Sequence, residues 1–237
     1  MINIRRDGQF LEDYDPGAYD RPSVTVDLVL LGMHQGRLSA LLLRREQPPQ
    51  AGYWALPGGF VAVEESLDAA AARVLHDKAG MKGAHFEQLY SFGAVDRDPR
   101  MRIITVAYLA LLREDQMTAA ARAGHVAIAA LEGETIEAIG EDRSVLPLAF
   151  DHQAILTLAR ERLRGKIDYS DLAFAFLPPQ FTLRALQNVH EAVLGTPLNK
   201  PAFRRRMLDR GWLVPTGMRE DDASHRPAEL FTLGKTS

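Results

Sequence analysis

The segment from Gly58 to Met81 constrains what this chain can fold into more than any other stretch of its 237 residues. It opens on two glycines and then runs from Ser66 to Ala79 without Gly or Pro and with many alanines. Ser66 is suited to cap the N-terminus of a helix, and Gly80 is suited to end it. The sequence therefore predicts a loop, a helix between these two residues and a second loop.

The spacing within this segment resembles the Nudix box, the signature of pyrophosphate hydrolases, which reads Gly, five residues, Glu, seven residues, then Arg-Glu-apolar-any-Glu-Glu-any-Gly-apolar. The residues that fall on this pattern are Gly59, Glu65, Arg73, Leu75, Gly80 and Met81. In the family, the glutamates hold a divalent metal that neutralises phosphate charge and activates water. Here Val74, Asp77 and Lys78 occupy the three glutamate positions of the helix. We therefore expect a domain that binds a nucleotide without hydrolysing it efficiently.

Few metal ligands are left in this segment. Glu64, Glu65 and Asp77 are weak candidates for holding Mg²⁺, so the sequence predicts that no metal or other cofactor is required. Lys78 places an ammonium where the family keeps an acid, and it either contacts pyrophosphate in place of the metal or is a solvated helix residue. Arg73 either forms a surface ion pair with Asp77, four residues along, or orients the loops of the signature, as the resemblance implies.

Further arginines outside this segment add to a predicted ligand site. Arg44 and Arg45 end an apolar run, and a second group lies between Asp96 and Arg102. Guanidinium groups pair well with phosphate oxygens, although a charged hairpin turn is the alternative for the second group. This second group also resembles a segment of Nudix proteins that act on ADP-ribose. The predicted ligand-binding residues are Arg44, Arg45, Gly59, Glu65, Arg73, Lys78, Phe92, Arg97, Arg100 and Arg102.

Hydrophobic patterning predicts a layered domain over residues 23–165, preceded by a polar arm over residues 1–22. The expected elements are a hairpin of strands 24–31 and 38–44, the helix 66–79, strands near 87–92 and 102–112, and a helix over 151–164. Residues 117–140 mix an alanine run with one candidate strand at 125–130, and their assignment stays open. Strands that enclose one helix and are closed by another suit an α/β layered domain.

Pro178-Pro179 is the clearest break in the second half of the chain, and a separate domain is expected over residues 166–237. Thr182 and Asn199 can each cap a helix, and Gly211 can end the second of these helices. Two short strands follow around a charged loop. Helix, turn, basic helix and hairpin is the order of a winged helix-turn-helix.

The second helix of this domain is strongly basic. The chain has a net charge of −3, but from Phe181 onward nine Lys and Arg outnumber six Asp and Glu. Phe203, Met207 and Leu208 give the helix a buried edge, and its cations lie on or near another face, as a DNA-reading helix requires. A solvated amphipathic helix is the alternative. The predicted DNA-binding residues are Thr182, Asn199, Lys200, Arg204, Arg205 and Arg226.

From Tyr14 to Phe231 the chain resembles the Nudix-related transcriptional regulators of NAD metabolism, the NrtR family. The telling segments are Phe150-Asp-His, Leu163-Arg-Gly-Lys-Ile-Asp-Tyr-Ser, Leu177-Pro-Pro-Gln-Phe-Thr-Leu-Arg-Ala-Leu-Gln, Phe203-Arg-Arg and Arg226-Pro-Ala. The resemblance implies a Nudix-type α/β/α sandwich (α/β, or α+β) with a C-terminal winged helix-turn-helix. It also implies a homodimeric repressor that senses ADP-ribose or a related NAD metabolite. Such a repressor binds palindromic double-stranded DNA, and its ligand releases the DNA.

Composition excludes several other classes. The chain has no cysteine, which excludes disulfides, thiolate catalysis and cysteine-based zinc sites. No signal-like N-terminus and no stretch of about 18 apolar residues is present, so we expect a soluble cytoplasmic protein without a membrane partner. Two rival functions stay open at this point: a Mg-dependent Nudix hydrolase acting on ADP-ribose, and a winged-helix module that binds proteins.

Overall fold

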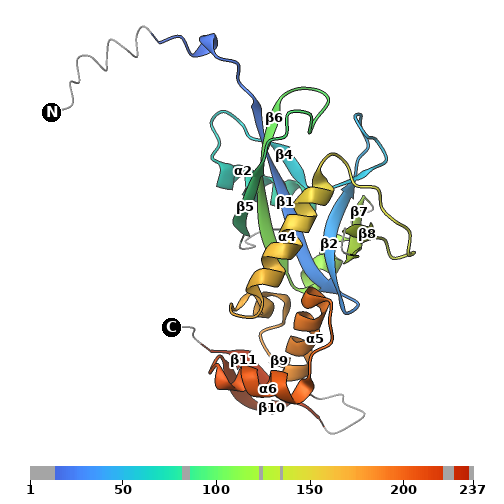
Figure 1. Ribbon diagram of the computed structural model, residues 1–237, viewed down its shortest axis with the longest axis vertical. Coiled ribbons are helices and arrows are strands. Elements are labelled where there is room, and N and C mark those ends of the chain that lie inside the picture. Colours follow the sequence, from blue (N-terminus) through green and yellow to red (C-terminus); the bar gives the residue numbers. More distant parts are fainter. Residues whose placement is uncertain (1–13, 82–85, 123–124, 134–135, 221–226, 235–237) are drawn as a thin grey trace, which may run out of the picture.

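The computed structural model describes residues 14–81, 86–122, 125–133, 136–220 and 227–234. A sheet-based body occupies one end of the molecule, and a smaller module that contains the last two helices occupies the other (Figure 1). The strands of the first body are β1 (Ser23–His34), β2 (Arg37–Arg44), β3 (Trp54–Ala55), β4 (Gly58–Phe60), β5 (Phe86–Phe92), β6 (Ile103–Leu112), β7 (Val126–Glu132) and β8 (Glu137–Ile139). Its helices are the short 3₁₀ turn η1 (Pro16–Ala18), α2 (Leu67–Ala79), α3 (Glu114–Ala120) and α4 (His152–Lys166).

The eight strands form one mixed sheet in the order β5-β6-β1-β2-β7-β8, with β3 beside β2 and β4 beside β1. Strands β1 and β2 form the predicted hairpin around Gln35-Gly36, two residues with positive φ. Strand β1 also pairs in parallel with β6, from Ser23 opposite Ile103 onward. It is therefore a central strand with partners on both edges. Its almost continuous apolar sequence is typical of a strand that is buried on both faces.

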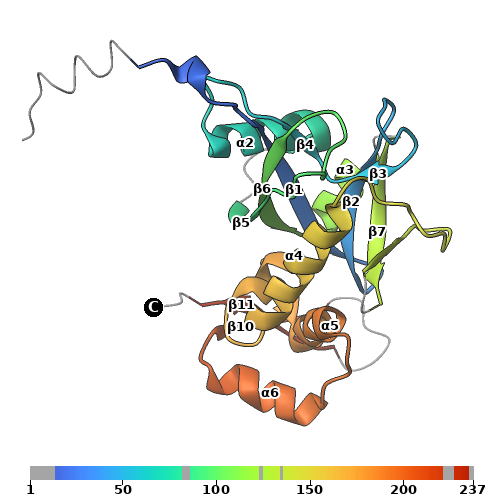
Figure 2. The ribbon, with the colours of Figure 1, turned by 45° about the horizontal axis from the view of Figure 1, so that its top comes forward.

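Alternate residues of β1 face two different layers. Val26 and Leu28 pack with the buried residues of α2, whereas Val29 and Leu31 belong to the core that contains α4. Successive side chains of a strand point to opposite faces, so this one strand supplies both layers. The result is a helix on each side of the sheet, which confirms the predicted α/β/α sandwich (Figure 2).

Helix α2 has the ends that the sequence predicts. Ser66 Oγ accepts a hydrogen bond from the backbone N–H of Ala69 at 3.2 Å, and Gly80 ends the helix in the left-handed conformation with φ 66°. The buried residues of the helix are Ala70, Ala71, Val74, Leu75 and Ala79. Three alanines on this face allow the helix to pack closely on the sheet.

The smaller module has the order of a winged helix-turn-helix. Its elements are η2 (Leu172–Phe176), β9 (Phe181–Thr182), α5 (Leu183–Leu194), α6 (Lys200–Asp209), β10 (Leu213–Arg219) and β11 (Glu229–Leu233). The three strands form a separate sheet in the order β10-β11-β9. The core of this module is continuous with that of the sandwich, because Leu31, Ile155, Leu186 and Phe203 belong to one buried cluster. The two modules therefore pack through a shared apolar interior.

Between residues 117 and 140, which the sequence leaves open, the structure assigns the described residues 117–122, 125–133 and 136–140. Helix α3 begins at Glu114 and contains the first part of the alanine run, and β7 confirms the candidate strand. Strand β8 was not predicted. It has three residues and forms by pairing Ile139 with Ala130 of β7 at the sheet edge, so tertiary pairing rather than local propensity places it. Among the described residues, no helix is both long and apolar enough to cross a membrane.

Candidate functional site

A cavity of about 230 Å³ lies where β1 and β4 meet the loop after β5 and the start of α4. Its polar lining consists of Thr25, Asp27, Arg45, Arg97, Asp98, Arg100 and His152, and its aromatic lining consists of Phe60 and Phe150. Sites for whole small molecules usually measure about 300–1,000 Å³, so this cavity fits one half of a dinucleotide-sized ligand rather than all of it. Four predicted ligand-binding residues line it: Arg45, Gly59, Arg97 and Arg100.

Arg97 forms the charged centre of the cavity wall. Its guanidinium donates to both carboxylate oxygens of Asp151, at 2.9 and 2.7 Å, and to Asp27 Oδ2 at 3.4 Å. The Arg97 side chain is only 5% exposed. Burial works against its charge, but the contacts with Asp151 and Asp27 outweigh that effect and raise the pKa of Arg97 above its ordinary value. Arg97 is therefore a fixed cation that joins β1 to the start of α4.

His152 completes this buried network. Its Nδ1 accepts a hydrogen bond from the backbone N–H of Leu56 at 2.9 Å, and its Nε2 lies 3.8 Å from Asp27 Oδ1. Burial lowers the pKa of His152, so the ring is neutral, and the bond from Leu56 places the remaining proton on Nε2. The backbone of Gly58 also approaches this carboxylate closely, because a Cβ on Gly58 would lie 2.2 Å from Asp27 Oδ1.

Two arginines form the more accessible rim of the cavity. Arg45 lies over the ring of Phe150 at 4.7 Å and donates to the carbonyl of Pro49 at 3.0 Å. Burial, and then the nearby charge of Arg100, lower the pKa of Arg45. Arg100 makes a bidentate pair with the buried Asp98, at 3.0 and 2.8 Å. Two guanidinium groups held close together by separate contacts favour an anion between or beside them.

The Nudix box itself is held together by an arginine. Arg73 donates to both oxygens of Glu65, at 2.7 and 2.8 Å, and to the carbonyl of Phe60 at 2.9 Å. The hydrogen bond from Arg73, followed by that from a backbone N–H, lowers the pKa of Glu65 to about 2. Arg73 thus ties the loop before α2 to the helix and partners Glu65, while Asp77 contacts His76 at 3.0 Å.

The carboxylates around α2 do not fit a divalent metal. Glu65 is occupied by Arg73, and Val74 lies 1% exposed in the core that α2 shares with the sheet. Glu64 and Asp77 are exposed. No cluster of three or more His, Cys, Asp or Glu in the described ranges is arranged to hold a metal ion. The three weak candidates for Mg²⁺ are therefore not gathered into one site.

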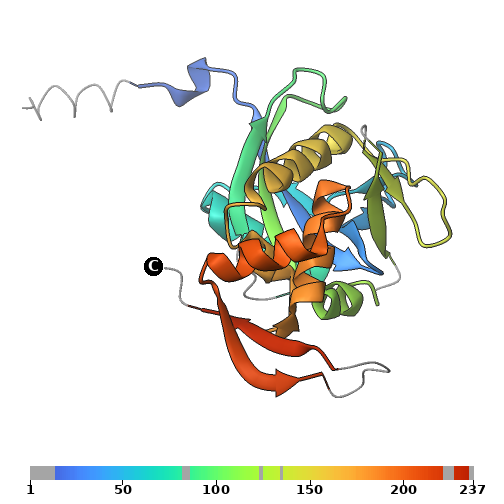
Figure 3. The ribbon, with the colours of Figure 1, turned by 60° about the horizontal axis from the view of Figure 1, so that its bottom comes forward.

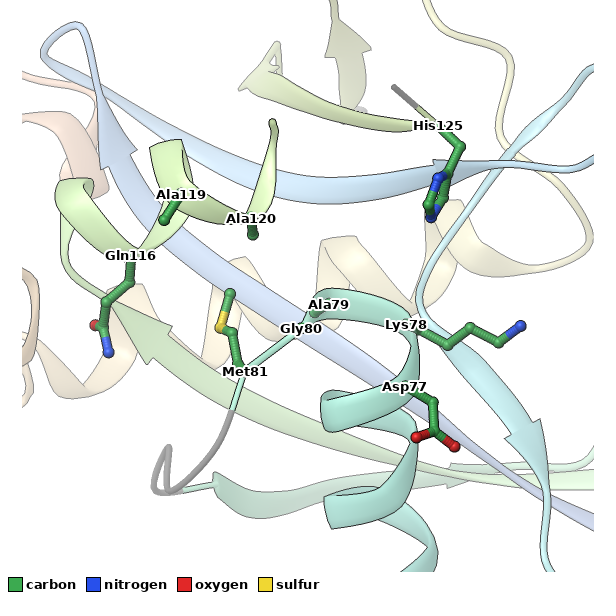
Figure 4. A pocket seen from close by; sticks show the side chains of 9 residues that line it. All are labelled: Asp77, Lys78, Ala79, Gly80, Met81, Gln116, Ala119, Ala120 and His125. Carbon is green, nitrogen blue, oxygen red and sulfur yellow. The ribbon is translucent and has the colours of Figure 1, made fainter. Parts of the chain in front are cut away.

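A second, more open groove of about 410 Å³ adjoins the cavity. The two share the wall residues Arg45, Ala55, Leu56 and Gly58. Arg44 and Lys78 line the groove and not the cavity, so the predicted cations are divided between two adjoining spaces. Lys78 and His125 also line a further pocket between the end of α2 and α3, and Figure 4 shows both side chains at the end of that pocket away from Gln116.

The basic helix α6 lies on the surface of the smaller module, with the β10–β11 hairpin beside it (Figure 3). Lys200, Arg204 and Arg205 are exposed. Arg206 instead lies 3.2 Å from Asp168 Oδ1, and Arg210 donates to the backbone carbonyl of Asp168. The cations of α6 are thus divided into an outward set and a pair that fixes the helix to the rest of the molecule.

Comparison with known proteins agrees with this architecture. A family model for the NUDIX domain matches residues 21–148, and one for the NrtR DNA-binding winged helix domain matches residues 173–233. The ADPR responsive transcriptional repressor NtrR of Acinetobacter baylyi is 38% identical over 236 residues, which cover 97% of this chain and 89% of that protein. The chain belongs to the NrtR family. The prediction made from the segments after the Nudix box is confirmed.

Other relatives of this NrtR-family chain share one or both modules. The crystal structure of Shewanella oneidensis NrtR complexed with a 27mer DNA superposes with a TM-score of 0.75 at 36% identity, covering 89% of this chain and 93% of that chain. An ADP-ribose pyrophosphatase of Methanocaldococcus jannaschii is 31% identical over 139 residues, which cover 58% of this chain and 73% of that enzyme.

Several residues predicted for the NrtR-family sites lie elsewhere. Arg102 donates to the carbonyls of Gly93 and Ala94, both at 2.8 Å, and so shapes the loop before β6, and Phe92 packs edge-on against Tyr90 at 5.6 Å. Neither Arg102 nor Phe92 lines the cavity or the groove.

Two of the predicted DNA-binding residues are helix caps. Thr182 is only 6% exposed, and its hydroxyl accepts a bond from Ala185 N at 3.1 Å. Asn199 is exposed but caps α6 through Ala202 N at 3.0 Å. The burial of Thr182 removes it from the surface offered to DNA, which corrects the prediction. Arg226 lies outside the described residues.

The sequence alone did not single out the acids and the histidine of this NrtR-family cavity. Asp27 is the one charged residue in the apolar strand β1, and an acid at such a position requires a buried partner. This lone acid in an apolar strand was the sequence signal that could have identified Asp27 as a residue of the cavity. Asp151 and His152 appear in the sequence only within Phe150-Asp-His, a segment that carries the family resemblance, because their partners lie far away in sequence. Asp98 is paired with Arg100, two residues along, in the group between Asp96 and Arg102.

Proposed function

We propose that this chain is a homodimeric cytoplasmic repressor of transcription whose binding to palindromic operator DNA is controlled by ADP-ribose or a related NAD metabolite. The observation that carries the proposal is the combination, in one molecule, of an arginine-rimmed cavity and an exposed basic helix on a winged helix-turn-helix. Family membership supports it, since a relative matching 97% of the chain is named as an ADPR responsive repressor. A second relative of similar fold was crystallised with DNA.

The chemistry of the cavity suits one half of a dinucleotide-like effector. At the rim, Arg45 offers its guanidinium group to phosphate oxygens, and Arg100 offers hydrogen-bond donors to the part of the ligand inside the cavity. Deeper in the cavity, the carboxylate of Asp27 and the neutral ring of His152 offer hydrogen-bonding groups of the kind that hold ribose hydroxyls. Phe150 and Phe60 supply aromatic surface on which a base can stack. We propose these residues as the effector-binding set.

The outward cations of α6 are proposed to contact DNA. Lysine usually meets phosphate, whereas arginine can read guanine through a bidentate pair, so we assign Lys200 to the backbone and Arg204 and Arg205 to base edges or phosphates. A dimer would place two such helices on half-sites about one helical turn apart. Ligand release of DNA requires that the effector binds the free conformation more tightly than the DNA-bound one.

The test is a selection of genomic DNA fragments on the full chain, with and without ADP-ribose, followed by gel shifts of the fragments retained. We expect a small set of palindromic fragments to bind without ligand and to be released by ADP-ribose. Retention of no fragment at low salt would overturn the proposal and favour a protein-binding role for the winged helix. If fragments are retained equally with and without ADP-ribose, ADP-ribose is not the effector, and the proposed DNA-binding role still stands.

A second candidate function is hydrolysis of ADP-ribose, because the chain is 31% identical to an ADP-ribose pyrophosphatase over part of its length. The proposed repressor carries a buried Val74 and a cationic Lys78 at two of the family's acid positions, which disfavours a metal-activated water. Release of AMP from ADP-ribose with Mg²⁺, at turnover rates above about 1 s⁻¹, would instead place the chain among ordinary enzymes.

A further inference from the structure

The groove next to the cavity is built from four separate segments. The end of β2 and the loop after it contribute Arg44, Arg45 and Glu46, the end of α2 contributes Lys78, the residue before β7 is His125, and the rest comes from the segment between β3 and β4. Residues so distant in sequence meet here because β2 pairs with both β3 and β7. The groove is thus a product of the fold rather than of one flexible loop.

Cations predominate along this groove. Its charged lining consists of the cations Arg44, Arg45 and Lys78 and the single acid Glu46, and His125 adds an imidazole. Within the described ranges, neither the Lys78 ammonium nor the Arg44 guanidinium makes a hydrogen bond or an ion pair. Figure 4 shows the Lys78 and Asp77 side chains leaving α2 in different directions, and Asp77 does not line the groove. The positive charge of Lys78 is therefore free to meet an anion.

The same region is unsuited to the metal that the Nudix fold implies. Val74 is buried, Glu65 is held by Arg73, and Lys78 stands where a carboxylate would be needed. A dication near these cations would be repelled, whereas a diphosphate would be attracted by every one of them. The charge that a metal supplies in a hydrolase is thus available here from the chain itself.

We propose that the effector's diphosphate lies in this groove and is bound without a divalent metal, with Lys78 and Arg44 meeting its oxygens and Arg45 bridging groove and cavity. This inference rests on the proposed function, and it assigns to the groove the anionic part of a nucleoside diphosphate. The remaining half of the ligand enters the cavity, which is too small for the whole molecule and shares the Arg45 wall with the groove.

The test is isothermal titration of the full chain with ADP-ribose, once in EDTA and once in Mg²⁺. We expect wild-type affinity to be the same in both buffers. In EDTA, Lys78→Met and Lys78→Glu should each lose affinity, the latter by at least about tenfold, and Lys78→Arg should retain it. Arg122→Glu is the matched control. It reverses one exposed charge just after α3, at a residue that lines neither the cavity nor the groove, so the affinity for ADP-ribose should not change.

The outcomes separate this inference from the proposal on which it rests. ADP-ribose that binds the wild type only when Mg²⁺ is present would overturn metal-free binding and leave the repressor function standing. Unchanged affinity of both Lys78→Met and Lys78→Glu in EDTA would overturn the role of Lys78. If the wild type binds no ADP-ribose in either buffer, the assignment of ADP-ribose as the effector is wrong. The inference about the groove then fails as well. Lys78 is exposed, so these substitutions do not threaten the fold.

Discussion

Arg206 Nη2 lies 3.2 Å from Asp168 Oδ1, which ties the basic helix α6 to the segment that directly follows α4. Arg210, from the end of the same helix, donates to the backbone carbonyl of Asp168. At the opposite end of α4, Asp151 and His152 belong to the polar network of the cavity. A helix of 15 residues, about 22 Å long, therefore connects the proposed effector site to the proposed DNA-reading helix.

Asp168→Ala should weaken the response of DNA binding to ADP-ribose. Both partners of the Arg206 pair are partly exposed, so its loss should cost less than about 1 kcal/mol of stability. We expect the ratio of operator affinities without and with ADP-ribose to fall about fivefold, with ADP-ribose affinity unchanged, as fluorescence anisotropy can measure. Asp171→Ala is the control, because that side chain makes no capping bond. If the Asp168→Ala protein keeps the full response to ADP-ribose, coupling between the effector site and α6 does not depend on Asp168.

Arg97→Ala should destabilise the fold strongly. Arg97 and Asp27 are 5% and 9% exposed, so removal of the guanidinium leaves two carboxylates, those of Asp27 and Asp151, without their partner. Breaking a buried charge pair in this way costs about 3–5 kcal/mol. The free energy of unfolding from urea denaturation should fall by that amount. Arg143→Ala, which breaks a pair on an exposed surface, should change it by less than about 1 kcal/mol. Similar losses in the two variants would contradict the argument.

Gly58→Ala should damage both the cavity and the fold. The added Cβ would lie 2.2 Å from Asp27 Oδ1 and 3.0 Å from the carbonyl of Val26, so the carboxylate must move. We expect a loss of about 1–3 kcal/mol in the free energy of unfolding and weaker binding of ADP-ribose. Gly165→Ala is the control: it lies inside α4 with nothing within 4 Å of its Cβ, and it should stabilise by about 0.5–1 kcal/mol. Unchanged stability and binding of Gly58→Ala would show that Asp27 has room to shift.

Local signals explain which parts of this fold were predictable. Ser66 and Gly80 mark the ends of α2 by the bonds they make to neighbouring residues, and Asn199 does the same for α6. By contrast, Asp27, Arg97 and Asp151 meet only because the sheet and α4 bring distant segments together. No pattern in the sequence records that contact.

Residue type also leaves two roles unresolved until the structure is known. Thr182 suits either a helix cap or a DNA contact, and only its burial decides for the cap. Arg205 and Arg206 are adjacent and chemically identical. The packing of α6 on the segment after α4 turns Arg206 toward Asp168 and leaves Arg205 exposed. The division of the predicted ligand-binding cations between cavity and groove could not be read from the sequence for the same reason.

Lys200→Ala and Arg204→Ala should weaken operator binding in different ways. Lys200, at the start of α6, is proposed to meet phosphate, so its loss should lower affinity for all sequences and reduce the salt slope by about 1. Arg204 is proposed to read a base, so its loss should cost about 1–3 kcal/mol on the operator if it pairs with guanine, and less on unrelated DNA. Gel shifts at several salt concentrations measure both effects. Arg122→Ala, just after α3 in the sandwich, should leave both unchanged, and equal behaviour of all three variants would reject α6 as the reading helix.

Stability should fall as the pH drops below 6.5, because two buried histidines are held neutral. Burial lowers the pKa of both His152 and His190 from the ordinary value of 6.5. The charged groups near the first are Asp27, Asp151, Arg97 and Arg45, and those near the second are Asp168, Arg206 and Arg210. A depressed pKa means that the unfolded chain binds more protons in this window, so stability is complete above 6.5 and is lost as the pH falls toward the folded value.

Each neutral histidine should contribute a slope of about 0.7 kcal/mol per pH unit to the free energy of unfolding at pH 6.5, rising toward about 1.4 at lower pH while the folded histidine stays neutral. The pKa of Glu65 is lowered from 4.5 to about 2, so this residue changes the stability only below about pH 4.5 and does not alter the slope near pH 6.5. The rings of His190 and Phe203 lie 5.0 Å apart, so His190→Phe keeps an aromatic group at this position. The variant should lose the contribution of His190 to the pH dependence of the free energy of unfolding. Urea denaturation on either side of pH 6.5 measures this. An equal slope in wild type and variant would mean that His190 takes up a proton inside the folded protein as readily as outside it.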